Sequence, residues 1–446
     1  MAEFAEVILN LPLDRAFTYR IPERLRGRGA PGVRVDVPFG KRMTHGYVVR
    51  LAETAAYPKI RDLEDSTDDV LANAKLLELT RWVAARYACS WGEALNAAIP
   101  SGAKTKNPGR IVRVLSAGEG EPKSPKQKIA LEFARGLSTP LLRKEFEKRS
   151  GVSSSVLTAM VKAGFLREDK VRPAIDALGD ALVEKRKTIT LTPDQEEALR
   201  AIEQGGVVLL HGVTGSGKTE VYLRAIERTV GQGKQAIVLV PEIALTPQTV
   251  SRFKARFGRV AVQHSVLTQG DRAEQWKAIR DGKIDVVVGA RSAVFAPCPA
   301  LGLIVLDEEH EAAYKQDNDP RYHAREVAVE RARLEGAVVI LGSATPSLES
   351  IHRSRAGAYR LARLPRRIEG REMPEIEVVD MAAEKAELKR HPLLSRRLEQ
   401  LMRQSMERRE QAILFLNRRG FLTHVSCRLC GWFFSCRRCD VAMTWH

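Results

Sequence analysis

One stretch decides the fold of this chain: Gly212-Val213-Thr214-Gly215-Ser216-Gly217-Lys218-Thr219. It follows an apolar run over residues 207–210 and precedes a segment with helical spacing over 220–226, which predicts a strand, a loop and a helix in that order. In this context the backbone amides of the loop wrap phosphate groups at a helix N-terminus, whereas a chance glycine turn would bind nothing. We predict that Lys218 contacts the β- and γ-phosphates of ATP and that the Thr219 hydroxyl binds Mg²⁺. The glycines expected to line this site are Gly212, Gly215 and Gly217.

A second motif, Asp307-Glu308-Glu309-His310, follows a short apolar run of the kind that is buried in a parallel sheet. Acidic side chains at the C-terminal end of such a strand lie where ligands bind in open α/β sheets. We predict that Asp307 binds Mg²⁺, directly or through water, and that Glu308 orients and deprotonates the attacking water. An acidic cluster after a strand is usually a solvated loop, but its pairing with a phosphate loop favours catalysis.

From residue 188 onward, apolar strands alternate with amphipathic helices, which indicates a parallel α/β sheet. Strands are expected over residues 207–210, 236–240, 260–263, 286–288, 303–306 and 338–341. Gln195 precedes the phosphate loop and is placed to contact the adenine edge. Residues 241–248 and 289–293 follow two strands, where amides and hydroxyls can grip a nucleic-acid backbone, and residues 342–346 carry two hydroxyls that could link the phosphate site to neighbouring loops. Each segment alone also fits a structural turn.

The N-terminal half shows two further modules. The first has β-type alternation over 33–37 and 46–49, a turn over 38–41 and a helix over 76–87, and the linker 101–109 ends it. The second is expected to contain short helices over 125–137, 141–149 and 153–163, with residues 164–167 beginning a β wing. Three helices and a β turn fit a winged helix, and any small helical spacer domain would show the same pattern.

The composition limits the class of protein. A length of 446 residues suggests roughly three domains, and 44% hydrophobic residues suffice for real cores. Basic residues outnumber acidic ones by 72 to 55, so the net charge of +17 favours nucleic acid as a partner before a membrane; a generally basic soluble protein is the alternative. The N-terminus lacks signal-peptide features and no apolar run approaches the ~20 residues of a membrane span, so we expect a cytoplasmic protein.

Four of the six cysteines crowd the C-terminal end: Cys427, Cys430, Cys436 and Cys439. In a cytosolic enzyme this spacing points to Zn²⁺ rather than to disulfides. Zinc takes four tetrahedral ligands, and two cysteine pairs usually need a gap of ~12 to 20 residues to face each other. Here the gap is five residues, so one site built from both pairs fits poorly.

Together these motifs resemble a superfamily-two helicase and, more narrowly, the primosomal replication-restart helicases of the PriA family. The matching segments are 212–219, 307–310, 342–346, and 415–421 followed directly by the cysteine pairs. The last combination is the most discriminating, because generic helicases have no cysteine cluster there. The resemblance implies an α/β protein with four parts: a β-rich domain over 1–105 that binds a DNA 3′ end, a winged helix over 106–180, a RecA-like helicase lobe 1 over 188–365, and the start of lobe 2 with part of a zinc-binding region over 366–446.

The resemblance also implies ATP-dependent 3′→5′ unwinding at stalled forks and D-loops, and primosome assembly. The implied partners are forked and single-stranded DNA, single-stranded-DNA-binding protein, primosome proteins and the replicative helicase loader, and the implied cofactors are ATP, Mg²⁺ and Zn²⁺. A double-stranded DNA translocase and a non-catalytic form that binds forks are the alternatives.

In the family each cysteine pair shares a zinc with a later pair, so each site would hold half its ligands here. The family continues past His446 with the rest of lobe 2 and its arginine finger. Because such an arginine can be worth ~10³ to 10⁵ in rate, we expect this chain alone to bind nucleotide but hydrolyse it poorly.

Further DNA contacts follow from the resemblance. Phe17, Thr18, Gly40 and Lys59 correspond to the pocket for a 3′ end, where the family has Phe-Asp-Tyr and this chain has Phe17-Thr18-Tyr19. Thr18 offers only a weaker hydroxyl contact, so we expect reduced end discrimination. Residues 314–326 resemble an aromatic-rich loop that couples DNA binding to ATP hydrolysis, with contacts expected from Arg321 and Tyr322; a solvated polar loop is the alternative.

Overall fold

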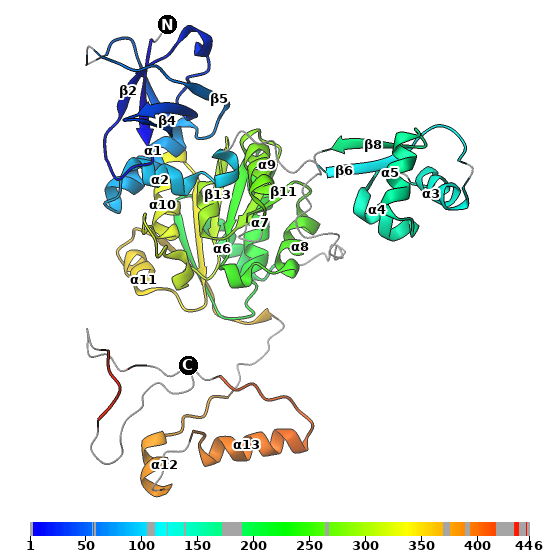
Figure 1. The fold of residues 1–446 in the computed structure, drawn as a ribbon. Helices are drawn as coiled ribbons and strands as arrows, with labels where there is room; N and C mark the ends of the chain where they lie inside the picture. The colour runs from blue at the N-terminus through cyan, green and yellow to red at the C-terminus, as the bar shows by residue number, and fades with distance from the viewer. Residues whose placement is uncertain are drawn as a thin grey trace. The chain divides into compact units, whose positions relative to one another are not determined.

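The computed structural model describes residues 3–55, 57, 59–104, 112–122, 124–137, 140–171, 190–263, 267–368, 375–388, 393–415, 432–436 and 443. The chain divides into two units, Met1–Arg371 and Glu372–His446. The described part of the first unit holds three sheets, two of them antiparallel and one parallel (Figure 1).

The N-terminal module contains a five-stranded antiparallel sheet in the order β2-β1-β4-β3-β5. Its strands are β1 (Phe4–Leu9), β2 (Phe17–Arg20), β3 (Val33–Phe39), β4 (Arg42–Ala52) and β5 (Asp65–Val70). Helices α1 (Ala74–Arg86) and α2 (Trp91–Ala98) follow, and the Asn73 side chain and a Ser90–Glu93 capping box satisfy their first amides. The strands and the helix expected from the sequence are confirmed. The turn is tighter than expected, because β3 and β4 stay paired as far as Phe39 and Arg42 and Gly40 turns with a φ of +60°.

The second module has helices α3 (Pro125–Arg135), α4 (Arg143–Ser150) and α5 (Ser154–Lys162) around an antiparallel sheet in the order β7-β6-β8. Its strands are β6 (Val112–Ala117), β7 (Leu141–Leu142) and β8 (Leu166–Val171). A separate core, which includes Leu115, Phe146 and Leu157, holds the module together. Residues 141–142 form a strand rather than the start of a helix because they pair with β6, which the sequence analysis did not predict.

The third module contains a seven-stranded parallel sheet in the order β11-β12-β10-β13-β14-β9-β15. Its strands are β9 (Val207–Gly212), β10 (Gln235–Leu239), β11 (Val260–Gln263), β12 (Val286–Gly289), β13 (Leu301–Leu306), β14 (Val338–Ser343) and β15 (Arg360–Leu364). The six strands expected from the sequence are all present. The seventh, β15, was not predicted.

Helices cover both faces of this sheet (Figure 1). They are α6 (Pro193–Glu203), α7 (Lys218–Gly231), α8 (Pro247–Arg256), α9 (Gln269–Arg280), α10 (Ala324–Glu335) and α11 (Leu348–Arg355). Because side chains alternate along a strand, Val208 and Leu210 pack with α6 and α7, while Leu209 packs with α10 on the other face.

The N-terminal module shares the core of the α10 face, where residues of α1 and α2 such as Leu76 and Leu95 are buried. The Trp276 indole on α9 donates a hydrogen bond to the Leu71 carbonyl at 3.1 Å. This continuous core fixes the N-terminal module against the parallel sheet.

In the second unit, the described residues form α12 (Met381–Leu388) and α13 (Arg396–Glu407). Arg396 donates a hydrogen bond to Glu384, and Arg397 donates one to Glu377. No residue of α13 is buried.

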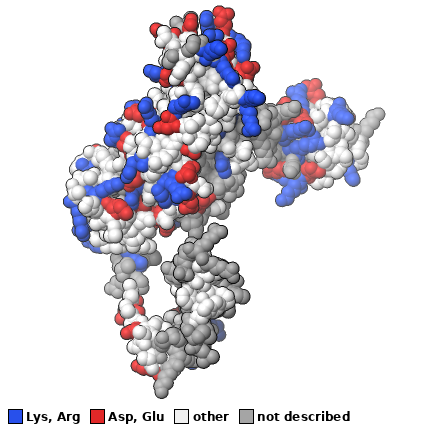
Figure 2. All heavy atoms as spheres, turned by 60° about the vertical axis from the view of Figure 1, so that its left-hand side comes forward, with Lys and Arg blue, Asp and Glu red and all other residues white. Residues whose placement is uncertain are grey.

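Two further properties concern the charged surface and the apolar character of the helices. On the face drawn in Figure 2, basic side chains are spread over the described parts and interspersed with acidic ones. Among the described residues, no helix has the length and apolar character that crossing a membrane requires.

Candidate nucleotide and nucleic-acid sites

The phosphate loop joins β9 to α7, and its glycines are required by geometry. Gly215 and Gly217 have φ angles of +81° and +82°, in the left-handed region that side-chain-bearing residues rarely adopt. A Cβ on Gly217 would also lie 2.3 Å from the Gln195 side-chain nitrogen. Since α7 begins at Lys218, the amides of the loop and the positive end of the helix dipole lie together. Such an arrangement binds phosphate.

Lys218 brings the phosphate loop and the acidic motif together. Its buried Nζ donates a hydrogen bond to the Gly212 carbonyl at 2.9 Å and lies 3.9 Å from Glu308 Oε1. Glu308 has a φ of +47°, a conformation that costs a non-glycine residue roughly 1 kcal/mol. Strain of this kind gathers at functional sites, where the surrounding structure enforces it.

Asp307 directly follows the strand β13, which packs against α7. The Tyr222 hydroxyl donates a hydrogen bond to Asp307 Oδ1 at 3.0 Å. Burial and the neighbouring Glu308 carboxylate raise the pKa of Asp307 above its ordinary value. A divalent cation would relieve both effects, and the Asp307 carboxylate and Thr219 hydroxyl are the oxygen ligands that Mg²⁺ prefers. The residues therefore fit the Mg²⁺ predicted from the sequence.

Glu309 anchors the acidic motif in the core. Its fully buried carboxylate accepts hydrogen bonds from Arg325 Nη1 at 2.8 Å, the Ser347 nitrogen at 2.7 Å and the Ser350 hydroxyl at 3.0 Å. Burial alone would raise the pKa of Glu309, but these hydrogen bonds hold it below its ordinary value. The sequence analysis gave Glu309 and Arg325 no role, because an ion pair between residues 16 positions apart leaves no periodic signal.

His310 joins the acidic motif to the segment after β14. Its Nδ1 lies 2.7 Å from the Ser343 hydroxyl and its Nε2 lies 3.4 Å from the Thr345 hydroxyl. The two hydroxyls that were expected to reach neighbouring loops therefore meet the imidazole of His310.

Gln195 holds the start of α6 against the phosphate loop. Its Oε1 accepts a hydrogen bond from the Thr192 nitrogen at 2.9 Å, and its Nε2 donates to the Ser216 carbonyl at 3.3 Å. The side chain is buried and engaged with the protein. Its contact with adenine stays a prediction.

A cluster of aromatic and basic side chains forms at one end of the N-terminal sheet. The Phe17 ring packs edge-on against Phe39 with centroids 5.2 Å apart, and the Arg15 guanidinium lies 4.7 Å from the Phe17 centroid. Arg61 Nη1 donates a hydrogen bond to the Gly40 carbonyl at 2.7 Å. The structure therefore brings Phe17 and Gly40 into one cluster.

The other two residues expected at the 3′-end pocket lie differently. Lys59 is exposed on the segment that leads to Arg61. Thr18 pairs with Glu6 across the two strands, and strand alternation directs its side chain to the face opposite that of Phe17. Thr18 thus lies on the outer face, beside the ion pair of Glu6 and Arg50.

The segment over 314–326 is less exposed than its sequence suggests. Tyr322 is buried and packs edge-on against Phe295, with centroids 5.2 Å apart, so in this structure its ring is not available to stack on a base. Tyr314 is also buried, and its hydroxyl donates to the carbonyls of Leu239 and Asp307 at 2.9 and 2.7 Å. Arg321 is exposed and pairs with Asp319, and its contact with DNA stays a prediction.

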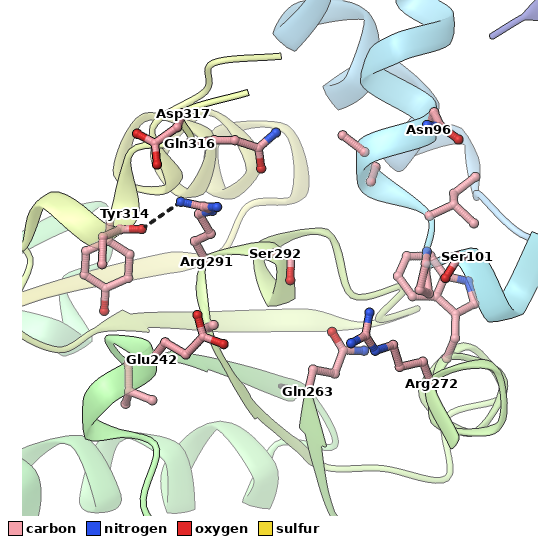
Figure 3. Close-up of a pocket in the computed structure, with 18 of the residues that line it drawn as sticks. Asn96, Ser101, Glu242, Gln263, Arg272, Arg291, Ser292, Tyr314, Gln316 and Asp317 are labelled. Atoms are coloured by element: carbon pink, nitrogen blue, oxygen red, sulfur yellow. Dashed lines mark hydrogen bonds between the residues drawn. The ribbon is translucent and has the colours of Figure 1, made fainter. Parts of the chain in front are cut away.

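A cavity of about 710 Å³ lies between the N-terminal module and the carboxyl ends of β10, β11 and β12. Figure 3 shows Asn96, Ser101 and Arg272 at one end and Arg291, Gln316 and Asp317 at the other. The remaining polar side chains of its lining are Lys104, Glu242, Gln263 and Ser292. The cavity unites the two segments that were expected to grip a nucleic-acid backbone, 241–248 and 289–293.

Three of the four cysteines predicted to bind zinc, Cys427, Cys430 and Cys439, lie outside the described residues, as do residues 416–421 of the preceding motif. Cys436 is described and half-buried. Within the described ranges, no three His, Cys, Asp or Glu side chains are grouped so that they could hold a metal ion. Zinc binding therefore stays a prediction.

Comparison with known proteins agrees with this geometry. Residues 192–354 match the family model of DEAD/DEAH box helicases, and residues 6–100 match the model named 3'DNA-binding domain. Together with the phosphate loop, the acidic motif and the parallel sheet covered on both faces, these matches show a DEAD/DEAH box helicase domain that follows a 3′ DNA-binding domain in one chain.

Relatives narrow this class to one family. The replication restart protein PriA of Bacillus subtilis is 35% identical over 99% of this chain and 66% of its own length. The PriA protein of Haemophilus influenzae is 36% identical over 100% of this chain and 62% of its own length. The chain belongs to the PriA family of replication restart proteins and spans between 62% and 66% of the length of these two relatives.

A solved structure of RecG bound to a three-way DNA junction is 22% identical to this chain. The match covers 50% of this chain and 28% of the RecG chain, and its TM-score is 0.36.

Proposed function

We propose that this chain is the nucleotide-binding part of a DNA helicase that uses ATP to move 3′→5′ at stalled forks and D-loops. The observation that carries the proposal is the distance of 3.9 Å between Lys218 Nζ and Glu308 Oε1, which joins a phosphate-binding cation to a candidate base. Membership of the PriA family supports the role in replication restart and primosome assembly.

In the proposed mechanism the phosphates of ATP lie on the amides of residues 212–219. The Lys218 ammonium leaves the Gly212 carbonyl and contacts the β- and γ-phosphates. The Asp307 carboxylate and Thr219 hydroxyl would hold Mg²⁺, which when bound would supply positive charge beside the transferred phosphate. The Glu308 carboxylate orients a water molecule and accepts its proton.

In this proposal the two residues that follow Glu308 hold the acidic motif in place. Glu309 ties the acidic motif to Arg325 on α10, and His310 ties it to Ser343 and Thr345. Because α10 begins within the segment over 314–326, a change at the phosphates reaches that segment through hydrogen-bonded contacts in a low-dielectric interior.

DNA would be held by several parts of the chain. The cluster of Phe17 and Gly40, with Lys59, binds a 3′ end, and Thr18, on the opposite face of the same strand, gives weaker end discrimination than an acidic residue. Arg321 contacts a phosphate, whereas Tyr322 has a packing role. Residues 112–171 serve as a winged helix; three helices beside a small antiparallel sheet support that assignment.

The remaining proposals concern zinc and protein partners. The pairs Cys427–Cys430 and Cys436–Cys439 each supply two thiolates to a separate Zn²⁺ site. Single-stranded-DNA-binding protein, primosome proteins and the replicative helicase loader are the partners that family membership supports.

Steady-state ATP hydrolysis with and without single-stranded DNA tests the proposed function. Nucleotide binding with hydrolysis near background supports a motor that needs a complete second lobe, and DNA-stimulated hydrolysis supports a motor active in this form. The absence of nucleotide binding would overturn the proposal in favour of a non-catalytic DNA-binding form. Stimulation by duplex DNA, without strand displacement on forks, would favour a double-stranded translocase.

A further inference from the structure

Tyr222 connects the helix α7 to the acidic motif from inside the core. Its side chain is buried, and its hydroxyl donates a hydrogen bond to Asp307 Oδ1 at 3.0 Å. We propose that Tyr222 is a positioning residue for Mg²⁺, because its hydroxyl fixes the orientation of the Asp307 carboxylate. The inference rests on the proposed function and adds to it a residue that acts on the cation only through Asp307.

The spacing of residues on α7 brings two contacts to two consecutive acidic residues. Lys218 and Tyr222 are four positions apart, so they lie on the same face of the helix. Lys218 Nζ lies 3.9 Å from Glu308 Oε1, and the Tyr222 hydroxyl bonds to Asp307. One face of α7 therefore contacts both the candidate base and the candidate Mg²⁺ ligand.

The Tyr222 hydroxyl reaches Asp307 past a neighbouring strand. In the parallel sheet, β14 lies between β9, which leads into α7, and β13, which leads into Asp307. Gly342 of β14 leaves the room for the contact, because a Cβ there would lie 1.5 Å from the Tyr222 hydroxyl oxygen and 2.6 Å from the ring carbon that carries it. A side chain at position 342 would therefore displace the hydroxyl.

A hydrogen-bond donor on a carboxylate makes its position as a metal ligand better defined. The two oxygens of Asp307 offer several acceptor positions, and Tyr222 uses one of them on Oδ1, so others can serve a cation. Partners of this kind typically contribute roughly 10- to 100-fold to metal affinity. Mg²⁺ demands near-ideal octahedral geometry, whereas Ca²⁺ accepts flexible geometry. Loss of the Tyr222 hydroxyl should therefore weaken binding of Mg²⁺ more than binding of Ca²⁺.

A second buried tyrosine bonds to the same residue at a different atom. The Tyr314 hydroxyl donates to the main-chain carbonyl of Asp307 at 2.7 Å. A bond to the main chain holds the residue in place but does not orient its carboxylate. Tyr314→Phe is therefore the matched control for Tyr222→Phe, because each variant loses one buried hydroxyl beside Asp307 and only one of them loses a bond to the carboxylate.

Binding of a fluorescent ATP analogue to the full 446-residue chain, titrated with Mg²⁺ and separately with Ca²⁺, measures the effect. In Tyr222→Phe the Mg²⁺ concentration at half-saturation should rise roughly tenfold, and that of Ca²⁺ should rise less. In EDTA the wild type and the variant should bind the analogue alike, because the loop amides and Lys218 are unchanged. Tyr314→Phe should keep the wild-type ratio of the two half-saturation values.

Two further variants separate orientation of the carboxylate from packing of the ring. Gly342→Ala keeps Tyr222 in the chain but displaces its hydroxyl, so it should raise the Mg²⁺ requirement in the same direction. In an Asp307→Asn background, Tyr222→Phe should cause no further change in the Mg²⁺ requirement, because the hydroxyl acts through that carboxylate. Thermal unfolding of each variant confirms that it is folded.

Three results would overturn the inference: a wild-type Mg²⁺ requirement in Tyr222→Phe, an equal rise for Mg²⁺ and Ca²⁺, or the same shift in Tyr314→Phe. An additive effect in the Asp307→Asn background would also overturn it. In each case the proposed function survives, because the wild type still binds the analogue. A wild-type chain that does not bind the analogue would overturn both.

Discussion

The Tyr87 hydroxyl accepts a hydrogen bond from the backbone nitrogen of His323 at 3.2 Å, which joins the end of α1 in the N-terminal module to the start of α10. Lys315 Nζ lies 5.2 Å from the centroid of the same ring. His323 caps α10, and Arg325 two residues later binds Glu309 of the acidic motif. Tyr87 therefore contacts the segment over 314–326 two residues before Arg325, which binds the neighbour of the candidate catalytic base.

Tyr87→Phe should remove the hydrogen bond to His323 without leaving a cavity, because the ring stays and only the hydroxyl is lost. A net hydrogen bond of about 1 kcal/mol corresponds to roughly fivefold faster amide exchange in a peptide that contains His323. Hydrogen-exchange mass spectrometry measures this rate directly. Tyr57→Phe, at an exposed tyrosine, is the control; equal exchange in both variants would show that the hydroxyl does not hold the junction.

Glu309→Gln should destabilise the folded chain, because it leaves the buried Arg325 guanidinium with Glu326 as its remaining counter-charge and removes the closer of its two ion pairs. Removing one partner of a buried ion pair costs roughly 3 to 5 kcal/mol, whereas Glu78→Gln in an exposed pair with Lys75 should cost no more than about 1 kcal/mol. Urea unfolding compares the two variants. Similar losses for both would contradict the anchoring role of Glu309.

The pH dependence of stability follows from the same carboxylate. The folded-state pKa of Glu309 lies below its ordinary value of 4.5, so the ionised form stabilises the folded state above that pH. This contribution should be lost as the pH falls through the lower, folded pKa. The free energy of unfolding of Glu309→Gln should therefore decline less steeply than that of the wild type over the acid range, and parallel curves would exclude Glu309 as a source of the decline.

Glu308→Gln should keep affinity for ATP and Mg²⁺ while removing turnover in a form that carries a complete second lobe. The amide preserves the shape of the carboxylate but cannot accept the proton of the attacking water. Single-turnover hydrolysis and nucleotide titration separate the two effects. If turnover is unchanged, the base lies elsewhere.

Thr18→Asp should sharpen the preference for a fork with a free 3′-hydroxyl over one with a 3′-phosphate, because the new carboxylate repels the added phosphate. Since Glu6 lies directly across from Thr18, the like charges should also cost a few tenths of a kcal/mol in stability. Thr18→Asn is the uncharged control. An unchanged ratio of the two fork affinities would mean that Thr18 takes no part in reading the end.

Much of the helicase lobe was predictable because buried parallel strands carry continuous apolar runs, as in residues 303–306. The strand β15 was missed because it reads Arg-Leu-Ala-Arg-Leu, and it is held partly by Arg360, which donates to the carbonyls of Ala201 and Gly205. Lys218, Asp307 and Glu308 were predictable as neighbours because their motifs follow β9 and β13, whose carboxyl ends lie at one edge of the same parallel sheet with β14 between them.

Contacts between distant segments were not predictable. Tyr87 and His323 are 236 positions apart, and Tyr87 belongs to no motif. Tyr322 stands in a polar stretch, and only the packing of Phe295 reveals that its ring is buried. The cavity could not be predicted from the sequence either, because one wall comes from the N-terminal module and the other from the helicase lobe.

Titration of a fluorescent ATP analogue with Mg²⁺ against the wild-type chain and Lys218→Ala tests the central claim most directly, with fork-DNA binding measured on the same samples. The account predicts that the wild type binds the analogue, that Lys218→Ala loses at least about tenfold in affinity because a charge-assisted contact is gone, and that both bind fork DNA alike. Equal affinity of the two proteins for the analogue, or a parallel loss of fork binding in Lys218→Ala, would contradict it.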